Sequence, residues 1–180
     1  MKAVDPSVVH RLFYPGVPAL LCSSSGGSVS AMPVVSYTSI SAEPPLIGIA
    51  CAPRSFTLKL AIASGAFSLC FLDKRRAEAM SFLATHTGRG MTDKLAAAGL
   101  AHRRGRKVGA PVVSDSVAAV ECSVRSHRRV GDHVFLIGGV ESAYASGDFR
   151  GYWRFKNYAP ILYAGWQGGF STYRTASRRT

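Results

Sequence analysis

A chain of 180 residues, 47% of them hydrophobic, is long enough for one domain with a sizeable core. Its net charge of +12 favours anionic partners, among them phosphorylated cofactors, nucleic acid and acidic membrane surfaces. No stretch approaches the roughly 18 apolar residues of a membrane span, and no apolar core follows Lys2 as it would in a signal peptide. We therefore expect a single cytoplasmic domain over residues 1–180 that has no membrane partner.

The first part of the chain predicts a short helix followed by a β-hairpin. Asp5 is a suitable N-cap, and Pro6 suits the first turn, of a helix over residues 5–13. Two apolar segments, 17–23 and 28–36, flank a turn rich in Ser and Gly and predict a pair of strands.

The next segments alternate between strand and helix patterns. Apolar strands are expected over residues 46–51 and 66–72. Helices are expected over residues 55–63, 74–84 and 91–98, each with an apolar face or a suitable cap.

Residues 85–110, rich in Gly, Thr, Lys and Arg, are expected to form an excursion from the sheet. Beyond them, segments 117–125 and 133–140 predict a second hairpin, and residues 161–164 a last short strand. Six or seven short strands separated by turn signals predict a barrel or a sandwich. The glycine motifs of dinucleotide-binding and P-loop folds are missing from the sequence, which disfavours a doubly wound sheet.

Four cysteines lie in or beside apolar segments, and no two of them form a CxxC pair. Because free cysteine packs as a small apolar residue, we expect buried free thiols and not a zinc site. These cysteines are Cys22, Cys51, Cys70 and Cys122.

Hydroxyl side chains and a double proline are concentrated in residues 30–50, which end in an apolar strand. A strand that becomes irregular can offer backbone N–H groups to the edge of a flavin ring and hydroxyls to its ribityl chain. An ordinary strand and loop rich in Ser and Thr would explain the same composition.

Ser55, Thr57 and Lys59 stand at the N-terminus of the helix expected over residues 55–63. Free N–H groups and the helix dipole attract anions there, and hydroxyls with a cation suit a phosphate monoester. The alternative is an ordinary N-cap beside a solvated lysine.

Asp132 and His133 lie at the mouth of the second expected hairpin. A histidine in that place could donate a proton or contact a bound cofactor. The alternative is a surface turn residue.

Taken together and in this order, these segments resemble the flavin reductase-like family of FMN-binding proteins. The resemblance rests on SAMP, SxS and PPLIGIA, then RSFT, SGAFSLCFL, GDHVFLIGGVES and APILYAGWQGGFSTY. It covers about residues 11–173 and leaves a basic tail, 174–180, and the basic segment 102–107 unexplained. The implied fold is mainly β with inserted helices, a six-stranded Greek-key FMN-binding split barrel.

The resemblance also implies a site, in which His133 lies near the nicotinamide or the flavin ring and is the catalytic candidate. The sequence departs from the family at Ser30, where members often have Asn, and at Tyr37, where they often have Trp or Phe. By matching position, the flavin-binding residues would be Ser30, Met32, Ser39, Ile40, Ser41, Ser55, Thr57, Lys59, Tyr163 and Trp166.

The implied activity is an NAD(P)H-dependent flavin oxidoreductase that uses FMN, or FAD, and passes electrons to a partner oxygenase, a ferric complex or another acceptor. The resemblance implies a homodimer, and a charged fraction of 18%, below the roughly 25% that is usual, also favours hidden apolar surface. A second hypothesis is an FMN electron carrier of the flavoredoxin type, without fast NAD(P)H turnover. A third, which the resemblance disfavours, is a basic barrel that binds nucleic acid.

Overall fold

An antiparallel sheet of seven strands organises the residues that the computed structural model describes, 2–165 and 170–171. Each neighbouring pair is antiparallel, and the two outer strands leave the sheet open. This mainly β architecture with inserted helices confirms the predicted split-barrel class, with seven strands in the sheet where six were expected. In spatial order the strands are β2 (Ser28–Val34), β1 (Ala19–Ser25), β5 (Ala66–Phe71), β8 (Ala118–Val130), β9 (His133–Ala145), β4 (Pro45–Cys51) and β3 (Tyr37–Ala42).

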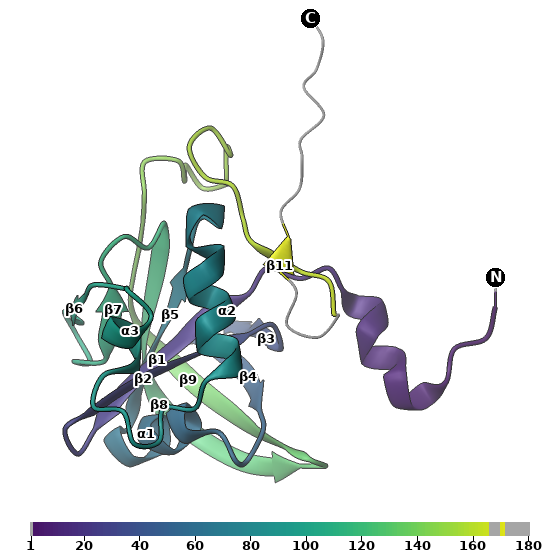
Figure 1. Cartoon of the computed structure of the whole chain (residues 1–180), viewed down its shortest axis with the longest axis horizontal. Helices are drawn as coiled ribbons and strands as arrows, with labels where there is room; N and C mark the ends of the chain where they lie inside the picture. The colour runs from purple at the N-terminus through teal and green to yellow at the C-terminus, as the bar shows by residue number, and fades with distance from the viewer. Residues whose placement is uncertain (1, 166–169, 172–180) are drawn as a thin grey trace, which may run out of the picture.

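Short helices and two small sheets connect these strands (Figure 1). The small sheets pair β6 (His102–Arg104) with β7 (Pro111–Val113), and β10 (Leu162–Tyr163) with β11 (Phe170–Ser171). Helix α1 packs against β1 and β2, while α2 and α3 pack against β2. The helical segments are η1 (Pro6–Phe13), α1 (Phe56–Ser64), η2 (Lys74–Arg76), α2 (Ala77–Thr85) and α3 (Lys94–Ala97).

The predicted capping residues act as expected. The Asp5 carboxylate accepts a hydrogen bond of 2.8 Å from the N–H of Ser7 and so caps η1, which is a 3-10 helix. The Ser55 hydroxyl accepts from the N–H of Leu58 at 3.3 Å and caps α1. Gly65 ends α1 with a φ of 69°, a conformation that glycine adopts without strain.

Several boundaries differ from the sequence prediction. Residues 37–42, expected to be irregular, form β3, because their backbone pairs with β4 along the edge of the sheet. The helix expected over 91–98 is confined to the four residues of α3. Strands β8 and β9 run beyond the predicted segments 117–125 and 133–140. The prediction stopped short because the added residues include polar side chains and show no apolar alternation. The basic excursion contains β6, which pairs with β7 directly after it, and these three-residue strands are too short for a sequence pattern.

The core lies on both faces of the central strands. Leu20 and Cys70 belong to the apolar cluster that α2, α3 and β7 cover, whereas Leu21 and Leu69 belong to the cluster that α1 covers. Because successive side chains of a strand point to opposite faces, β1 and β5 are buried along most of their length. All four cysteines are buried and unpaired, as predicted.

A glycine in β9 leaves room for a core side chain of β5. A side chain at Gly138 would collide with the ring of Phe67, which lies fully buried in β5. The pairing of β8 with β9 also shifts register at two places, and such bulges add local twist. In the sheet, β8 pairs with β5 on one side of this hairpin, and β9 pairs with β4 on the other.

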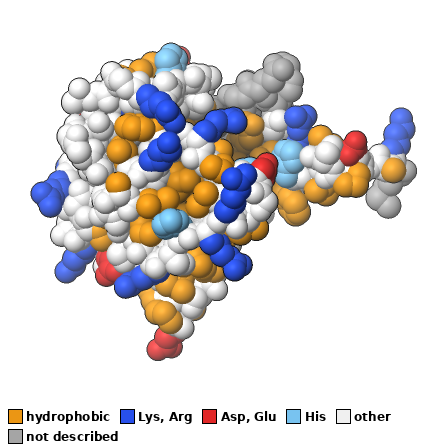
Figure 2. All heavy atoms as spheres, turned by 90° about the horizontal axis from the view of Figure 1, so that it is seen from below, with side chains coloured by type: hydrophobic (Ala, Val, Ile, Leu, Met, Phe, Trp, Pro, Cys, Tyr) orange, Lys and Arg blue, Asp and Glu red, His pale blue; other side chains and the backbone are white. Residues whose placement is uncertain are grey.

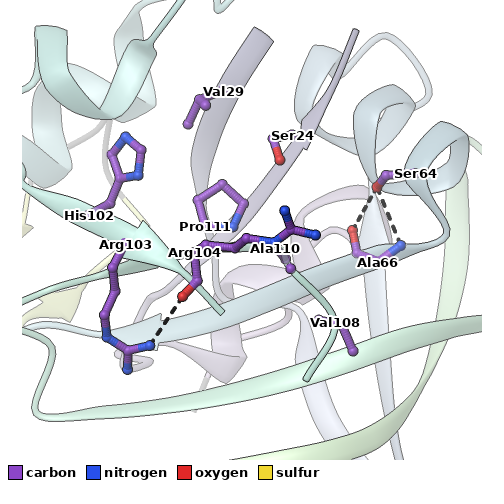
Figure 3. A pocket seen from close by; sticks show the side chains of 11 residues that line it. Ser24, Val29, Ser64, Ala66, His102, Arg103, Arg104, Val108, Ala110 and Pro111 are labelled. Carbon is purple, nitrogen blue, oxygen red and sulfur yellow. Dashed lines mark hydrogen bonds between the residues drawn. The ribbon is translucent and has the colours of Figure 1, made fainter. Parts of the chain in front are cut away.

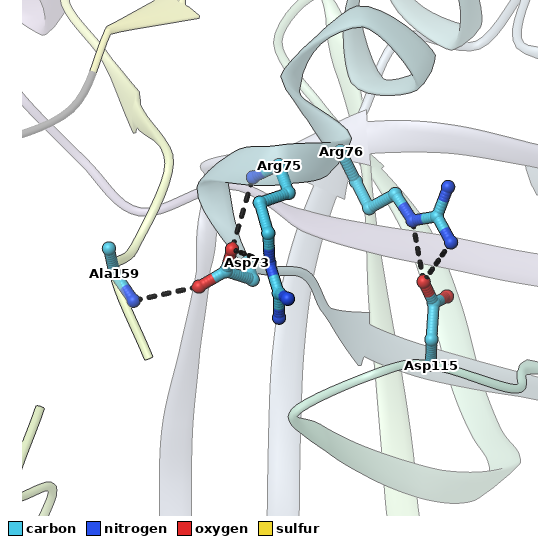
Figure 4. Close-up of polar contacts among 5 residues, drawn as sticks. All are labelled: Asp73, Arg75, Arg76, Asp115 and Ala159. Atoms are coloured by element: carbon cyan, nitrogen blue, oxygen red, sulfur yellow. Dashed lines mark hydrogen bonds and ion pairs between the residues drawn. The ribbon is translucent and has the colours of Figure 1, made fainter. Parts of the chain in front are cut away.

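The segment after β9 is tied back to the body of the protein by Asp73. Its carboxylate accepts from the N–H of Ala159 at 2.9 Å and from the N–H and guanidinium of Arg75 at 3.1 and 2.8 Å (Figure 4). This anchor brings β10 back toward the N-terminal part of the chain, where Tyr163 exchanges two backbone hydrogen bonds with Gly16.

The N-terminal segment projects from the sheet as an arm (Figure 1). Hydrophobic side chains are visible on this arm in Figure 2, and the exposed fractions of Leu12 and Phe13 are 62% and 79%. Among the helices of the described residues, none has the length and apolar character that crossing a membrane requires.

Candidate functional site

A cleft of about 530 Å³ opens between the N-terminus of α1, the end of β2 and the loop that follows α2. It brings together Met32, Ser55 and Thr57, three of the predicted flavin-binding residues, from two separate segments of the sequence. Its other lining residues include Pro33, Arg54, Phe56, Leu83, Gly88, Arg89 and Lys94.

Hydroxyl groups support the α1 side of this cleft. The Oγ of Ser30 and the Oγ1 of Thr57 lie 2.9 Å apart, and both residues are buried. The Ser55 hydroxyl donates to the Sδ of Met32 at 2.8 Å. The hydrogen bond from Ser30 therefore helps to fix the side chain of Thr57. The contact between Ser55 and Met32 joins β2 to the N-cap of α1.

The charged side chains that line the cleft within the described part of the chain are all cations. The guanidinium of Arg89 donates to the carbonyl of Arg54 at 3.3 Å, so both arginines lie on one side of the opening. The Nζ of Lys94 is buried and donates to the carbonyls of Ala31 and Leu83 at 2.9 and 2.7 Å. Burial lowers the pKa of Lys94 to about 8. Cations beside the free N–H groups of a helix N-terminus are the donors that a phosphate monoester needs.

The loop after α2 reaches the cleft because position 88 is a glycine. A Cβ on Gly88 would lie 2.5 Å from the Oγ of Ser30 and 3.0 Å from the ring of Phe56. The backbone of this loop therefore passes directly against the Ser30–Thr57 pair and closes one side of the cleft.

A second hollow, of about 760 Å³, adjoins the same stretch of chain. Met32 and Pro33 line the first cleft, while Val35 and Ser36 line the second hollow together with His133. Residues 32–36 thus connect the two. The remaining lining residues of the second hollow are Ser7, His10, Phe13, Tyr14, Gly16 and Asp132.

His133, the predicted catalytic residue, is partly exposed in this second hollow, with 45% of its side chain accessible. Its Nδ1 lies 2.7 Å from the Oδ1 of Asp132. This hydrogen bond, with the charge of the imidazole, lowers the pKa of Asp132. The pair orients the ring at the start of β9, outside the cleft that contains Thr57.

The predicted ring-end residues Ser39, Ile40 and Ser41 lie on β3, the outer strand of the sheet. They line neither the cleft nor the second hollow. Ile40 is 41% exposed and falls within the irregular pairing between Ser39 and Ser41.

The other predicted residues are also dispersed. Tyr163 packs edge-on against Tyr14, with ring centroids 4.9 Å apart, and so lies beside the second hollow. Lys59 is exposed on α1 and does not line the cleft. Trp166 lies outside the described residues.

The cleft also contains residues that the sequence prediction did not assign to the site, namely Arg54, Gly88, Arg89 and Lys94. Arg54 stands directly before the predicted Ser55 and was within reach of the sequence pattern. The other three belong to the region expected to be an excursion, and only the folding of that region onto β2 brings them to α1.

Comparisons with known proteins agree with this architecture. The family described as "Flavin reductase like domain" matches residues 10–164. A "Probable flavin reductase" from Rhizobium meliloti is 31% identical over 89% of this chain and 51% of its own length, and a "Flavin reductase" from Pseudomonas putida is 27% identical over 94% and 93%. The crystal structure of an FMN-binding protein from Thermus thermophilus superposes with a TM-score of 0.81 at 28% identity, over 96% of this chain and 94% of that one. The chain spans only 63% and 51% of the length of two of its curated relatives. Since the family match covers most of the sequence, the chain belongs to the flavin reductase like domain family.

Proposed function

We propose that this chain binds FMN and acts as an NAD(P)H-dependent flavin oxidoreductase. The observation that carries the proposal is the cleft at the N-terminus of α1. There Arg54, Arg89 and Thr57 line the cleft beside the N-terminus of the helix, with no carboxylate among the described lining residues. This donor set fits the phosphate monoester of FMN.

The phosphate end of the cofactor occupies the cleft in this proposal, and the ring end follows residues 32–36 toward the second hollow. Tyr14 and Tyr163 then lie near the ring, and His133 faces the nicotinamide. Ser39, Ile40 and Ser41 lie on the exposed outer strand β3. In this proposal they contact the flavin of the same subunit or the flavin of a second subunit. FAD is the alternative cofactor, because it contains the ring, the ribityl chain and the first phosphate of FMN.

When bound, the flavin supplies the hydride-accepting chemistry, and the protein supplies position and electrostatics. Arg54 and Arg89 neutralise the phosphate charge. The packed Ser30–Thr57 pair fixes the first turn of α1. The carboxylate of Asp132 accepts a hydrogen bond from the imidazole and so orients His133.

A partner oxygenase or a ferric complex is the proposed electron acceptor. The support is by relationship: the "Flavin-dependent monooxygenase, reductase subunit HsaB" of Mycobacterium tuberculosis is 29% identical over 59% of this chain. We further propose a homodimer, in which the exposed apolar side chains of the η1 arm, Val9, Leu12 and Phe13, are covered by the second subunit.

The test is a visible absorbance spectrum of purified protein reconstituted with FMN, followed by anaerobic addition of NADH or NADPH. We expect a retained flavin band that bleaches with either nucleotide. A retained band that neither nucleotide bleaches would overturn the reductase and leave an electron carrier of the flavoredoxin type. Failure to retain FMN or FAD would overturn the whole proposal.

A further inference from the structure

The basic segment that the family resemblance left unexplained is folded around a buried carboxylate. Glu121 on β8 has no exposed surface. Its two oxygens accept from the N–H groups of Arg106, Lys107 and Val108 at 2.8, 2.8 and 3.0 Å. The hydroxyl of Tyr144 donates to the same carboxylate at 2.5 Å. The loop between β6 and β7 therefore has a fixed shape, set by an acid beneath it.

Arg104 differs from the other arginines of this loop. Arg103 and Arg106 each place the guanidinium carbon 5.2 Å from the centre of the Tyr144 ring. The side chain of Arg104 forms no hydrogen bond or ion pair with the described residues. It packs instead over Gly109, where a Cβ would lie 3.0 Å from its Nε. Its guanidinium donors therefore stay available to a ligand.

A cavity of about 440 Å³ lies beside Arg104, between the β6–β7 hairpin, the β1–β2 hairpin and the end of α1 (Figure 3). His102 and Arg104, two residues apart on β6, lie on one wall, and the hydroxyl of Ser24 lies on another. Val29 and Pro111 supply apolar surface. No carboxylate belongs to the lining, as far as the described residues show.

Two acids whose partners lie on this hairpin or its loop, Glu121 and Asp93, are already engaged. Glu121 is saturated by the loop N–H groups and Tyr144, and the Oδ2 of Asp93 lies 2.7 Å from the Nε2 of His102. The positive charge of Arg104 is therefore not compensated by the described part of the protein. The cavity shares no lining residue with the cleft at α1, so an occupant would not displace the flavin phosphate.

We propose that this cavity is a second ligand site, which binds a small organic anion through Arg104. The anion carries a phosphate or carboxylate group, since a planar guanidinium pairs with either. A compact apolar body is required as well, because Val29 and Pro111 offer apolar contact within the cavity.

The experiment is calorimetric titration of the full chain, with and without saturating FMN, using phenyl phosphate, benzoate and inorganic phosphate as probes. We expect phenyl phosphate or benzoate to bind, with an affinity that falls at high salt and is the same when FMN is present. The preferred probe distinguishes a phosphate from a carboxylate ligand. Arg104→Ala should weaken binding by about tenfold or more, because a charge-assisted hydrogen bond is lost.

Arg128→Ala is the matched control, because Arg128 is an exposed arginine of β8 that does not line the cavity. Unchanged affinity in Arg104→Ala, or equal weakening in both variants, would overturn the site. Competition by FMN would show that the probe binds in the α1 cleft. This result would also overturn the second site. Equal affinity for inorganic phosphate would overturn the apolar part of the proposal.

Discussion

Ser30 on β2 and Thr57 on α1 share a hydroxyl–hydroxyl hydrogen bond of 2.9 Å in which both residues are buried. The bond joins the strand to the first turn of the helix that borders the cleft. Because both residues are almost fully buried, removing one hydroxyl leaves the other without this partner.

Thr57→Val should therefore lower the free energy of unfolding by about 1–3 kcal/mol, because it keeps the shape of the side chain but strands the Ser30 hydroxyl. Thr57→Ser is the control and should lose less, since the hydroxyl is kept. The Ser30→Ala/Thr57→Val double variant should cost less than the sum of the single changes. Urea denaturation measures the unaltered chain, Thr57→Val, Thr57→Ser, Ser30→Ala and the double variant, and strictly additive losses would contradict the coupling.

Arg54→Ala and Arg89→Ala should each weaken FMN binding by about tenfold, because each removes a cation from the phosphate end of the cleft. Lys59→Ala is the matched control and should leave the affinity unchanged, because Lys59 is exposed and outside the cleft. Fluorescence titration with FMN and with riboflavin measures the effect. A loss that is as large for riboflavin, which has no phosphate, would place the arginines elsewhere.

The contrast between Lys59 and Arg89 shows how far sequence reasoning reached into the site. Local signals were sufficient for Ser55, because an N-cap and its helix are neighbours in sequence, and the structure confirms the cap. The same reasoning assigned Lys59 to the phosphate. Lys59 stands one turn after Ser55 on α1, and its side chain is exposed to solvent. Arg89 joins the cleft through a contact between α2 and β2 that no periodicity encodes.

The fold class was predicted, whereas one outer strand was not, because only buried strands have a clear signal in the sequence. Buried strands such as β5 show continuous apolar runs that a sequence displays directly. The outer strand β3, with exposed Thr38 and Ser39, has no such run and forms because β4 offers its backbone. The residue pattern predicted a barrel or a sandwich, and the choice of a split barrel came from the family resemblance.

Glu121 should make the free energy of unfolding depend on pH in the acid range. Burial would raise its pKa, but the hydrogen bonds from Tyr144 and from the loop N–H groups outweigh burial and lower it from 4.5 to about 2. A carboxylate whose pKa is depressed on folding contributes stability above the unfolded pKa, and that contribution is lost as pH falls through the folded value. The free energy of unfolding should therefore decline between pH 4.5 and about 2.

Glu121→Gln should remove this part of the acid dependence and lower stability at neutral pH by about 2 kcal/mol, because its amide NH₂ would face N–H donors. Glu141→Gln is the control, since Glu141 lies in an exposed pair with Arg125. Urea unfolding at a series of pH values measures both. The same slope in Glu121→Gln as in the unaltered chain would show that other carboxyl groups cause the decline.

His133→Ala should slow reduction by NAD(P)H by about tenfold or more while leaving FMN affinity nearly unchanged. The reason is its place: the imidazole lies in the second hollow with Asp132, apart from the cleft that contains Thr57. Asp132→Asn is the matched control, because it keeps the imidazole and weakens only its orientation, so a smaller effect is expected. Stopped-flow bleaching of the flavin gives the rate, and fluorescence titration gives the affinity. Equal loss of rate and affinity would assign His133 to structure, and an unchanged rate would remove it from the reaction.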